Sequence, residues 1–171
     1  MKKILFVSIC AIILGTANVQ AQEADKIVGK YLPPEKDSVI EVFKCGDKYC
    51  GRTFCIKDNA YPADSKEGVP GTPYLDHHNP DPELKKKPNL GAQFLHNFVF
   101  KSEGKYVDGK IYNPRDGKTY CGKMDLDGDT LFLKGHLCIA SFLGKTNEWK
   151  RVDSSFNFAD PRLDCVDKKK K

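Results

Sequence analysis

Short stretches of alternating apolar and polar residues fill most of the chain after residue 26. Alternation with a period of two is typical of β-strands that bury one face. Residues typical of turns separate these stretches, and no long segment has the 3.6-residue period of an amphipathic helix. The pattern predicts eight strands, at residues 27–32, as two strands within 38–56, and at 94–101, 105–112, 118–126, 129–139 and 145–152.

Eight strands joined mostly by tight turns favour an all-β domain, a single closed up-and-down antiparallel barrel. Closure removes exposed strand edges, and a barrel of this size can hold one small ligand. A β-sandwich is the alternative architecture.

One connection, residues 57–93, is much longer than the others and contains six of the ten prolines. Strand periodicity is absent from it, and a connection this long is usually functional or disordered. Asp81 could cap a short helix with Pro82 at its first position, running to about Lys86. We expect this loop to act as a lid, formed by Asn79, Pro80, Asp81, Pro82, Leu84, Pro88, Leu90 and Gly91.

The hairpin within residues 38–56 predicts one disulfide. A two-residue turn at Asp47–Lys48 would place Cys45 opposite Cys50, within reach of a bond. In a second hairpin, a turn about Asp127–Gly128 would separate Cys121 from Cys138 by about 13 Å. We therefore do not expect these two to pair unless a bulge intervenes. The pairing of Cys55, Cys121, Cys138 and Cys165 stays open.

The same hairpin places Glu41, Phe43, Arg52 and Phe54 on one face. If that face is interior, Glu41 and Arg52 could orient the polar head of a ligand among aromatic rings. If it is exterior, they form an ordinary surface pair. The expected ligand-binding residues are Glu41, Phe43, Arg52, Phe54, Phe94, Phe98, Tyr112, Tyr120 and Leu133.

The first 21 residues predict a secretory signal peptide. Lys2 and Lys3 precede an apolar run that is too short to span a bilayer, and Val19-Gln20-Ala21 resembles a cleavage site. We expect a barrel domain over 22–152, a tail over 153–171 that ends in a lysine run, and a periplasmic or secreted product without a transmembrane segment. An even number of cysteines after the leader favours disulfides.

Charge and motif content disfavour several function classes. Lysines at the two ends account for the formal net charge of +5, so no basic face for nucleic acid is expected. His77 and His78 lack the further ligands that a metal site needs, and no serine or cysteine has a nucleophile context. We expect no metal, cofactor or catalytic residue.

Two short motifs at the ends of the predicted barrel would meet where it closes. Gly29-x-Tyr31 and Trp149-x-Arg151 resemble the Gly-x-Trp and late arginine of the lipocalin and fatty-acid-binding (calycin) superfamily, with tyrosine where tryptophan is usual. An arginine can stack on an aromatic ring there and plug the end.

Three longer blocks resemble the exported bacterial proteins of the domain of unknown function 2147 family. They are Ser38-Val-Ile-Glu-Val-Phe-Lys-Cys-Gly46 with Cys50-Gly-Arg52; Asn79-Pro-Asp-Pro-Glu-Leu84 with Pro88-Asn-Leu-Gly91; and Gly109-Lys-Ile-Tyr-Asn-Pro-x-x-Gly-Lys-Thr-Tyr120. The resemblance implies a small lipocalin-like barrel and carries over no catalytic residue. Four additional cysteines and the segment after residue 152 depart from the family pattern.

The leading hypothesis is an exported lipocalin-like protein that binds a small hydrophobic or amphipathic ligand in its barrel. The alternative is a protein-interaction module that uses the 57–93 loop or the lysine tail, and a third is an enzyme on the same scaffold.

Overall fold

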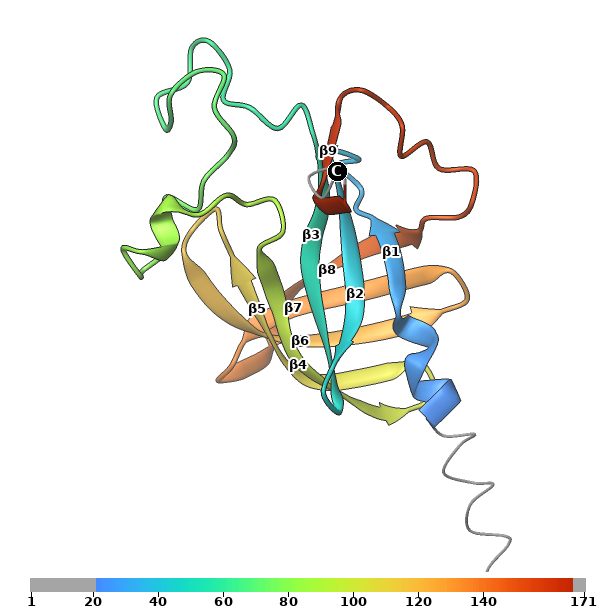
Figure 1. The fold of residues 1–171 in the computed structure, drawn as a ribbon. Helices are drawn as coiled ribbons and strands as arrows, with labels where there is room; N and C mark the ends of the chain where they lie inside the picture. The colour runs from blue at the N-terminus through green and yellow to red at the C-terminus, as the bar shows by residue number, and fades with distance from the viewer. Residues whose placement is uncertain (1–20, 168–171) are drawn as a thin grey trace, which may run out of the picture.

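The computed structural model describes residues 21–167, which form a β-barrel with short 3-10 helices (Figure 1). The predicted leader, apart from Ala21, and the lysine run at 168–171 lie outside these residues. The strands are β1 Gly29–Leu32, β2 Ser38–Cys45, β3 Lys48–Lys57, β4 Gln93–Ser102, β5 Lys105–Asn113, β6 Lys118–Asp127, β7 Thr130–Leu137, β8 Ala140–Arg151 and β9 Leu163–Cys165. The 3-10 helices are η1 Asp25–Ile27 and η2 Leu84–Lys86.

Strands β1 to β8 form a closed antiparallel ring. Each strand pairs with the next one along the chain, and β8 returns to pair with β1. This is the up-and-down barrel that the alternation predicted. The long connection carries a short helix, η2, but it begins at Leu84, two residues later than predicted, and Glu83 is its N-cap, with no side-chain cap bond. The Asp81 carboxylate accepts the backbone N–H of Glu83 just before the helix.

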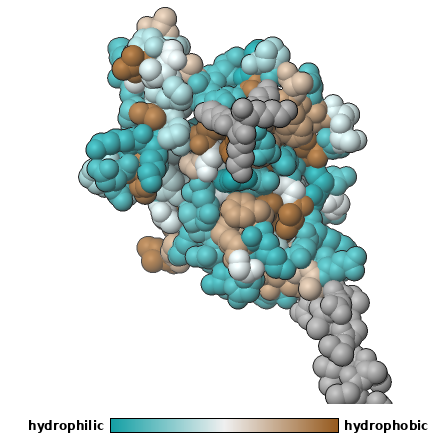
Figure 2. Space-filling view, viewed as in Figure 1, coloured by the Kyte–Doolittle hydropathy of each residue, from teal (hydrophilic) through white to brown (hydrophobic). Residues whose placement is uncertain are grey.

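The core fills one half of the barrel. The Phe98 ring lies so close to Gly109 and Gly122 that a side chain at either position would collide with it, so glycine is required where this ring crosses the interior. The surface seen in Figure 2 is largely hydrophilic. The buried residues of this core are Ala24, Ile27, Tyr31, Ile40, Val42, Tyr49, Leu95, Phe98, Tyr106, Met124, Leu131, Leu133 and Trp149.

The N-terminal helix η1 seals the filled end of the barrel. The Tyr106 hydroxyl donates to the Ala24 carbonyl at 2.7 Å, and the Tyr31 hydroxyl donates to the Ile27 carbonyl at 2.7 Å. Arg151 stacks over the Tyr31 ring, 4.8 Å from its centroid, and donates to the carbonyls of Val28 and Lys26. The residues expected at the closure therefore meet there, and a side chain at Gly29 would collide with Arg151.

The β2–β3 turn lies one residue earlier than predicted. Gly46 and Asp47 form it, so Cys45 pairs with Lys48 and Phe43 opposes Cys50. Gly46 has a φ of 71°, and glycine is favoured where the first central turn residue needs a positive φ. The predicted opposition of Cys45 and Cys50 was wrong, but the disulfide forms diagonally, with a Cα–Cα distance of 5.9 Å.

The expectation that Cys121 and Cys138 do not pair was also wrong. The β6–β7 turn is Gly128–Asp129, again with glycine first (φ 54°), so Met124 pairs with Leu133 and Cys121 with His136. A register shift after His136 accompanies a chain reversal at Cys138. The two Cα atoms lie 5.0 Å apart and the disulfide forms.

Residues beyond β8 fold back onto the outside of the barrel. Strand β9 pairs with the end of β3, and a disulfide joins Cys55 to Cys165. This segment covers a second apolar cluster outside the barrel. Its buried members are Val39, Phe54, Cys55, Leu163 and Cys165. The residues 153–167 are therefore part of the folded unit.

Replacing both Cys55 and Cys165 with serine should lower the free energy of unfolding by on the order of 3 kcal/mol, because this bond closes a long loop of the unfolded chain. The sequence separation is 110 for this pair and 5 for Cys45 and Cys50. Guanidinium unfolding of the two double-serine variants should therefore show the smaller loss for Cys45 and Cys50. Equal losses would contradict the argument.

Alkaline pH should destabilise the sealed end. Burial raises the pKa of Tyr31 to about 12 and that of Tyr106 to about 12, from an ordinary value of 10.0. Unfolded tyrosines ionise first as pH rises, so the stability held below pH 10 is lost between pH 10 and about 12. Urea unfolding across this range should show the decline, with a shallower slope in Tyr106→Phe. An identical slope in the variant would count against Tyr106 as a source.

Candidate functional site

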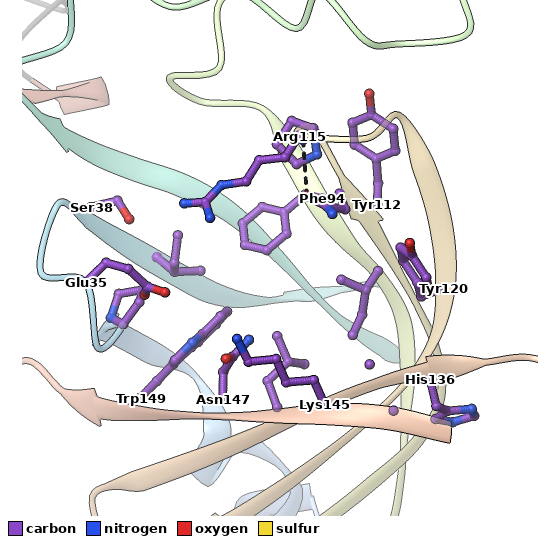
Figure 3. A pocket seen from close by; sticks show the side chains of 18 of the residues that line it. Glu35, Ser38, Phe94, Tyr112, Arg115, Tyr120, His136, Lys145, Asn147 and Trp149 are labelled. Carbon is purple, nitrogen blue, oxygen red and sulfur yellow. Dashed lines mark hydrogen bonds between the residues drawn. The ribbon is translucent and has the colours of Figure 1, made fainter. Parts of the chain in front are cut away.

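A pocket of about 600 Å³ occupies the end of the barrel opposite η1 (Figure 3). It lies above the filled half of the core, where the side chains of several strands leave space. Its deeper wall is apolar and is formed by Ile40, Phe94, Ile111, Leu133 and Trp149. Its mouth carries charged groups, including Glu35, Asp37, Arg115 and Lys145.

Strand β8 supplies one wall with graded polarity. Because successive strand residues alternate between faces, Trp149, Asn147 and Lys145 all point inward. They present an indole at the floor, an amide half-way and an ammonium at the mouth. A ligand along this wall would meet an apolar surface at one end and a cation at the other.

Arg115 provides a second cation at the mouth. It lies in the β5–β6 turn, where its backbone N–H donates to Asn113 Oδ1 at 3.1 Å, and its side chain extends across the pocket beside Phe94 (Figure 3). Within residues 21–167, neither the Arg115 guanidinium nor the Lys145 ammonium forms an ion pair with a carboxylate. Both are therefore available to an anionic group.

A second pocket of about 390 Å³ continues from the first beneath the long loop. The two pockets share Thr53, Phe94, Tyr112 and Pro114. Five of the expected lid residues line the second pocket: Asn79, Leu84, Pro88, Leu90 and Gly91. The remaining three, Pro80, Asp81 and Pro82, are exposed where the chain approaches η2.

The long loop is fastened to the barrel rim at a buried carboxylate. Asp76, only 7% exposed, accepts the Tyr112 hydroxyl at 2.7 Å and the Asn79 amide at 2.6 Å. Burial raises the pKa of Tyr112, and the bond to Asp76 raises it further. Tyr112 therefore stays neutral at physiological pH and holds the loop in place. Backbone bonds between Thr53 and residues 91–92 fasten the other end of the loop.

Four of the expected ligand-binding residues line the larger pocket: Phe94, Tyr112, Tyr120 and Leu133. Phe98 fills the core below it. Glu41, Phe43 and Arg52 lie on the outer face of the β2–β3 hairpin, where Arg52 pairs with Glu41 at 2.7 Å and lies over the Phe43 ring. The inner face carries Ile40 and Val42 instead.

Phe54 also lies outside the barrel. A bulge between Val39 and Ile40 turns the end of this hairpin, and Phe54 packs edge-on against Phe158 of the C-terminal segment at 6.1 Å. The sequence signal for this burial was the apolar character of both hairpin faces, which requires a cover on the outside as well as a core inside.

The sequence reasoning missed Ile111, Arg115, Lys145 and Asn147, and it assigned Trp149 to closure alone. The alternation along β8 could have identified Lys145 and Asn147, since they share a face with Trp149. No comparable signal marked Arg115, because a turn residue has no periodicity. The structure turns the His136 ring away from the pocket (Figure 3).

A comparison with family models matches residues 29–151 to DUF2147, described as an uncharacterized protein conserved in bacteria. The chain belongs to this family. No curated protein matches it. Among solved structures, a chain described as "Protein HP1028 from the human pathogen Helicobacter pylori belongs to the lipocalin family" is similar. It has a TM-score of 0.61 and 25% identity, and the match covers 75% of this chain and 84% of that one.

This family member is thus a lipocalin-like barrel with disulfides typical of an oxidising environment. In the part of the chain that the structure describes, no helix has the length and apolar character to cross a bilayer. The same residues contain no cluster of three or more His, Cys, Asp or Glu placed to hold a metal ion.

Tyr112→Phe should loosen the long loop, because it removes one hydrogen bond to a buried carboxylate at a cost of about 1 kcal/mol or more. Amide hydrogen exchange around residues 75–79 should therefore accelerate by about fivefold or more. Tyr49→Phe is the matched control, since its hydroxyl donates to Asp25 of η1, at the opposite end of the barrel. Faster exchange in the control, or none in Tyr112→Phe, would contradict this role.

Proposed function

We propose that this chain is an exported binding protein that holds a small, largely apolar ligand at the open end of its barrel. The observation that carries the proposal is the pocket of about 600 Å³ with an apolar floor, a size within the range of small-molecule sites. The predicted leader and the disulfides support a periplasmic or secreted location.

The arrangement of charges at the mouth supports an amphipathic ligand. The apolar part would pack against Phe94, Ile111 and Leu133, while an acidic group would lie near Arg115 and Lys145. Placing the charged end at the mouth keeps it partly hydrated, which avoids the cost of burying an ion. Glu35 and Asp37 on the opposite rim would repel an anion and so favour one orientation.

The polar groups around the pocket support binding more than catalysis. Asp76, the buried carboxylate nearest the pocket, is occupied by Tyr112 and Asn79. The raised pKa of Tyr112 makes its hydroxyl a poor base or nucleophile at neutral pH. These groups fasten the loop, and binding needs no further chemistry from them.

The proposal is tested with 1-anilinonaphthalene-8-sulfonate, a dye with an apolar body and an anionic group. We expect saturable binding that quenches Trp149, the chain's one tryptophan, because this residue lies on the pocket floor. The double substitution Arg115→Gln and Lys145→Gln should weaken binding by about tenfold, which corresponds to about 1.4 kcal/mol. Leu133→Phe should weaken it by narrowing the floor.

Arg52→Gln is the matched control, because it removes an arginine from the outer face and should leave dye binding unchanged. Equal weakening by Arg52→Gln, or full binding by Leu133→Phe with its fold verified by circular dichroism, would refute the pocket as the site. Native mass spectrometry of protein purified from its own host would then identify the natural ligand.

A further inference from the structure

The turn between β7 and β8 displays apolar side chains to water. Ile139 is 97% exposed and Phe142 is 80% exposed, with Leu143 at 52% and Leu137 at 45%. Apolar atoms project from the left edge of the molecule in Figure 2, where Figure 1 places this hairpin. We call residues 137–143 the apolar tip. Contiguous exposed apolar groups usually mark an interaction surface.

The apolar tip is held in its exposed position by covalent and steric constraints. The Cys121–Cys138 disulfide ties the residue before Ile139 to β6. At the base of the tip, Gly144 lies against the Gly135 carbonyl so closely that a side chain there would collide with it. The backbones of β7 and β8 are therefore closely packed at the base of the tip.

The surroundings of the tip are cationic. Residues 118–124 and 132–147 contain four lysines and no aspartate or glutamate. A fifth lysine, Lys110 of β5, places its Nζ 2.9 Å from Cys121 Sγ and 3.4 Å from Cys138 Sγ. The four lysines are Lys118, Lys123, Lys134 and Lys145.

The carboxylates at this end of the barrel lie to one side of the tip. Asp116 of the β5–β6 turn accepts the Tyr120 hydroxyl, and Glu35 and Asp37 belong to the β1–β2 connection across the pocket mouth. The rim formed by β5 to β8 therefore carries more cations than carboxylates, while Glu35 and Asp37 place two carboxylates on the opposite rim. A partner that contacts the tip should carry negative charge.

We propose that the apolar tip docks this protein onto the surface of an anionic lipid bilayer. Ile139 and Phe142 enter the interface between headgroups and acyl chains, and the lysines behind them contact the headgroups. A small projecting group of apolar side chains with lysines behind it suits the interface of an anionic bilayer. It offers less to a second protein, since stable protein interfaces bury about 800 Å² on each partner over a complementary face.

Docking in this orientation brings the pocket mouth to the lipid surface. Leu137 and Leu143 belong to both the tip and the mouth of the larger pocket, so an amphipathic ligand could pass between bilayer and barrel without crossing water. This consequence rests on the proposed function. The docking itself depends only on the tip and its lysines.

The test is flotation of the full chain, after export and processing in an expressing bacterium, with lipid vesicles. It should bind vesicles of phosphatidylglycerol mixed with phosphatidylcholine, and bind phosphatidylcholine alone much more weakly. Ile139→Ser with Phe142→Ser should weaken binding by at least about tenfold, because both side chains lose apolar burial. Lys134→Gln should weaken it by about fivefold, and added salt should do the same.

Two controls separate the tip from other sources of binding. Val69→Ser removes an apolar residue that is 68% exposed on the long loop and should have no effect. A chain that ends at residue 167 should retain tip-dependent binding without the terminal lysines. Binding that survives the loss of Ile139 and Phe142, or that disappears with residues 168–171, would overturn the proposal.

Two further outcomes are distinguishable. If the unaltered chain dimerises and Ile139→Ser with Phe142→Ser makes it monomeric without changing vesicle binding, the tip contacts a second copy and the proposal fails. Leu133→Phe should lose the dye and keep vesicle binding, because it alters the pocket floor and not the tip. Failure of the ligand pocket is thereby separated from failure of docking.

Discussion

Closure of the barrel depends on the short seam between β1 and β8. Their ladder pairs Tyr31 with Arg151 and Leu32 with Lys150, and one further backbone bond joins the Val152 N–H to the Lys30 carbonyl. Side chains reinforce this short join. Arg151 does this by stacking on Tyr31 and by donating to carbonyls at the start of the chain. Because these bonds also hold η1 against the core, one arginine couples ring closure to the sealing of one end. The ligand pocket can then open only at the other.

Hydrophobic alternation was enough to predict the eight barrel strands and their order, because most of these strands are long enough to show their period and most are joined by tight turns, but it did not predict β9. It was not enough to set the register. The two turns that the structure forms in place of the predicted ones, Gly46–Asp47 and Gly128–Asp129, both have glycine at the first central position. Moving a turn by one residue moves the pairing by two, which keeps each side chain on its face. The predicted inner and outer faces of the strands were therefore not affected by the misplaced turn. The same misplacement led to the wrong conclusion that Cys121 and Cys138 do not pair.

The site was harder to predict. A side chain lines the pocket only if it points into the barrel and also lies near the open end. Phe94 and Phe98 lie on the same strand four residues apart, yet Phe94 lines the pocket while Phe98 fills the core. The β2–β3 hairpin presented a different difficulty, since the apolar residues on its outer face are covered by a C-terminal segment distant in sequence. The apolar character of both hairpin faces indicates that a cover exists, but it does not identify the segment that supplies it. Arg115 could not be found in this way, because its position is set by a turn.

The apolar tip differs from the other apolar surfaces of this fold in that no described part of the chain covers it. The barrel uses its inner face for core and pocket, and the C-terminal segment covers the apolar outer face of β2 and β3. No described segment covers the β7–β8 turn in this way, although its residues are as apolar as those beneath the cover. A disulfide fixes the turn beside the pocket mouth. The fold thus covers the apolar outer face of β2 and β3 but leaves the apolar tip exposed. This difference is consistent with burial of the tip by a surface outside the protein. The lysines around the tip indicate that this surface is anionic.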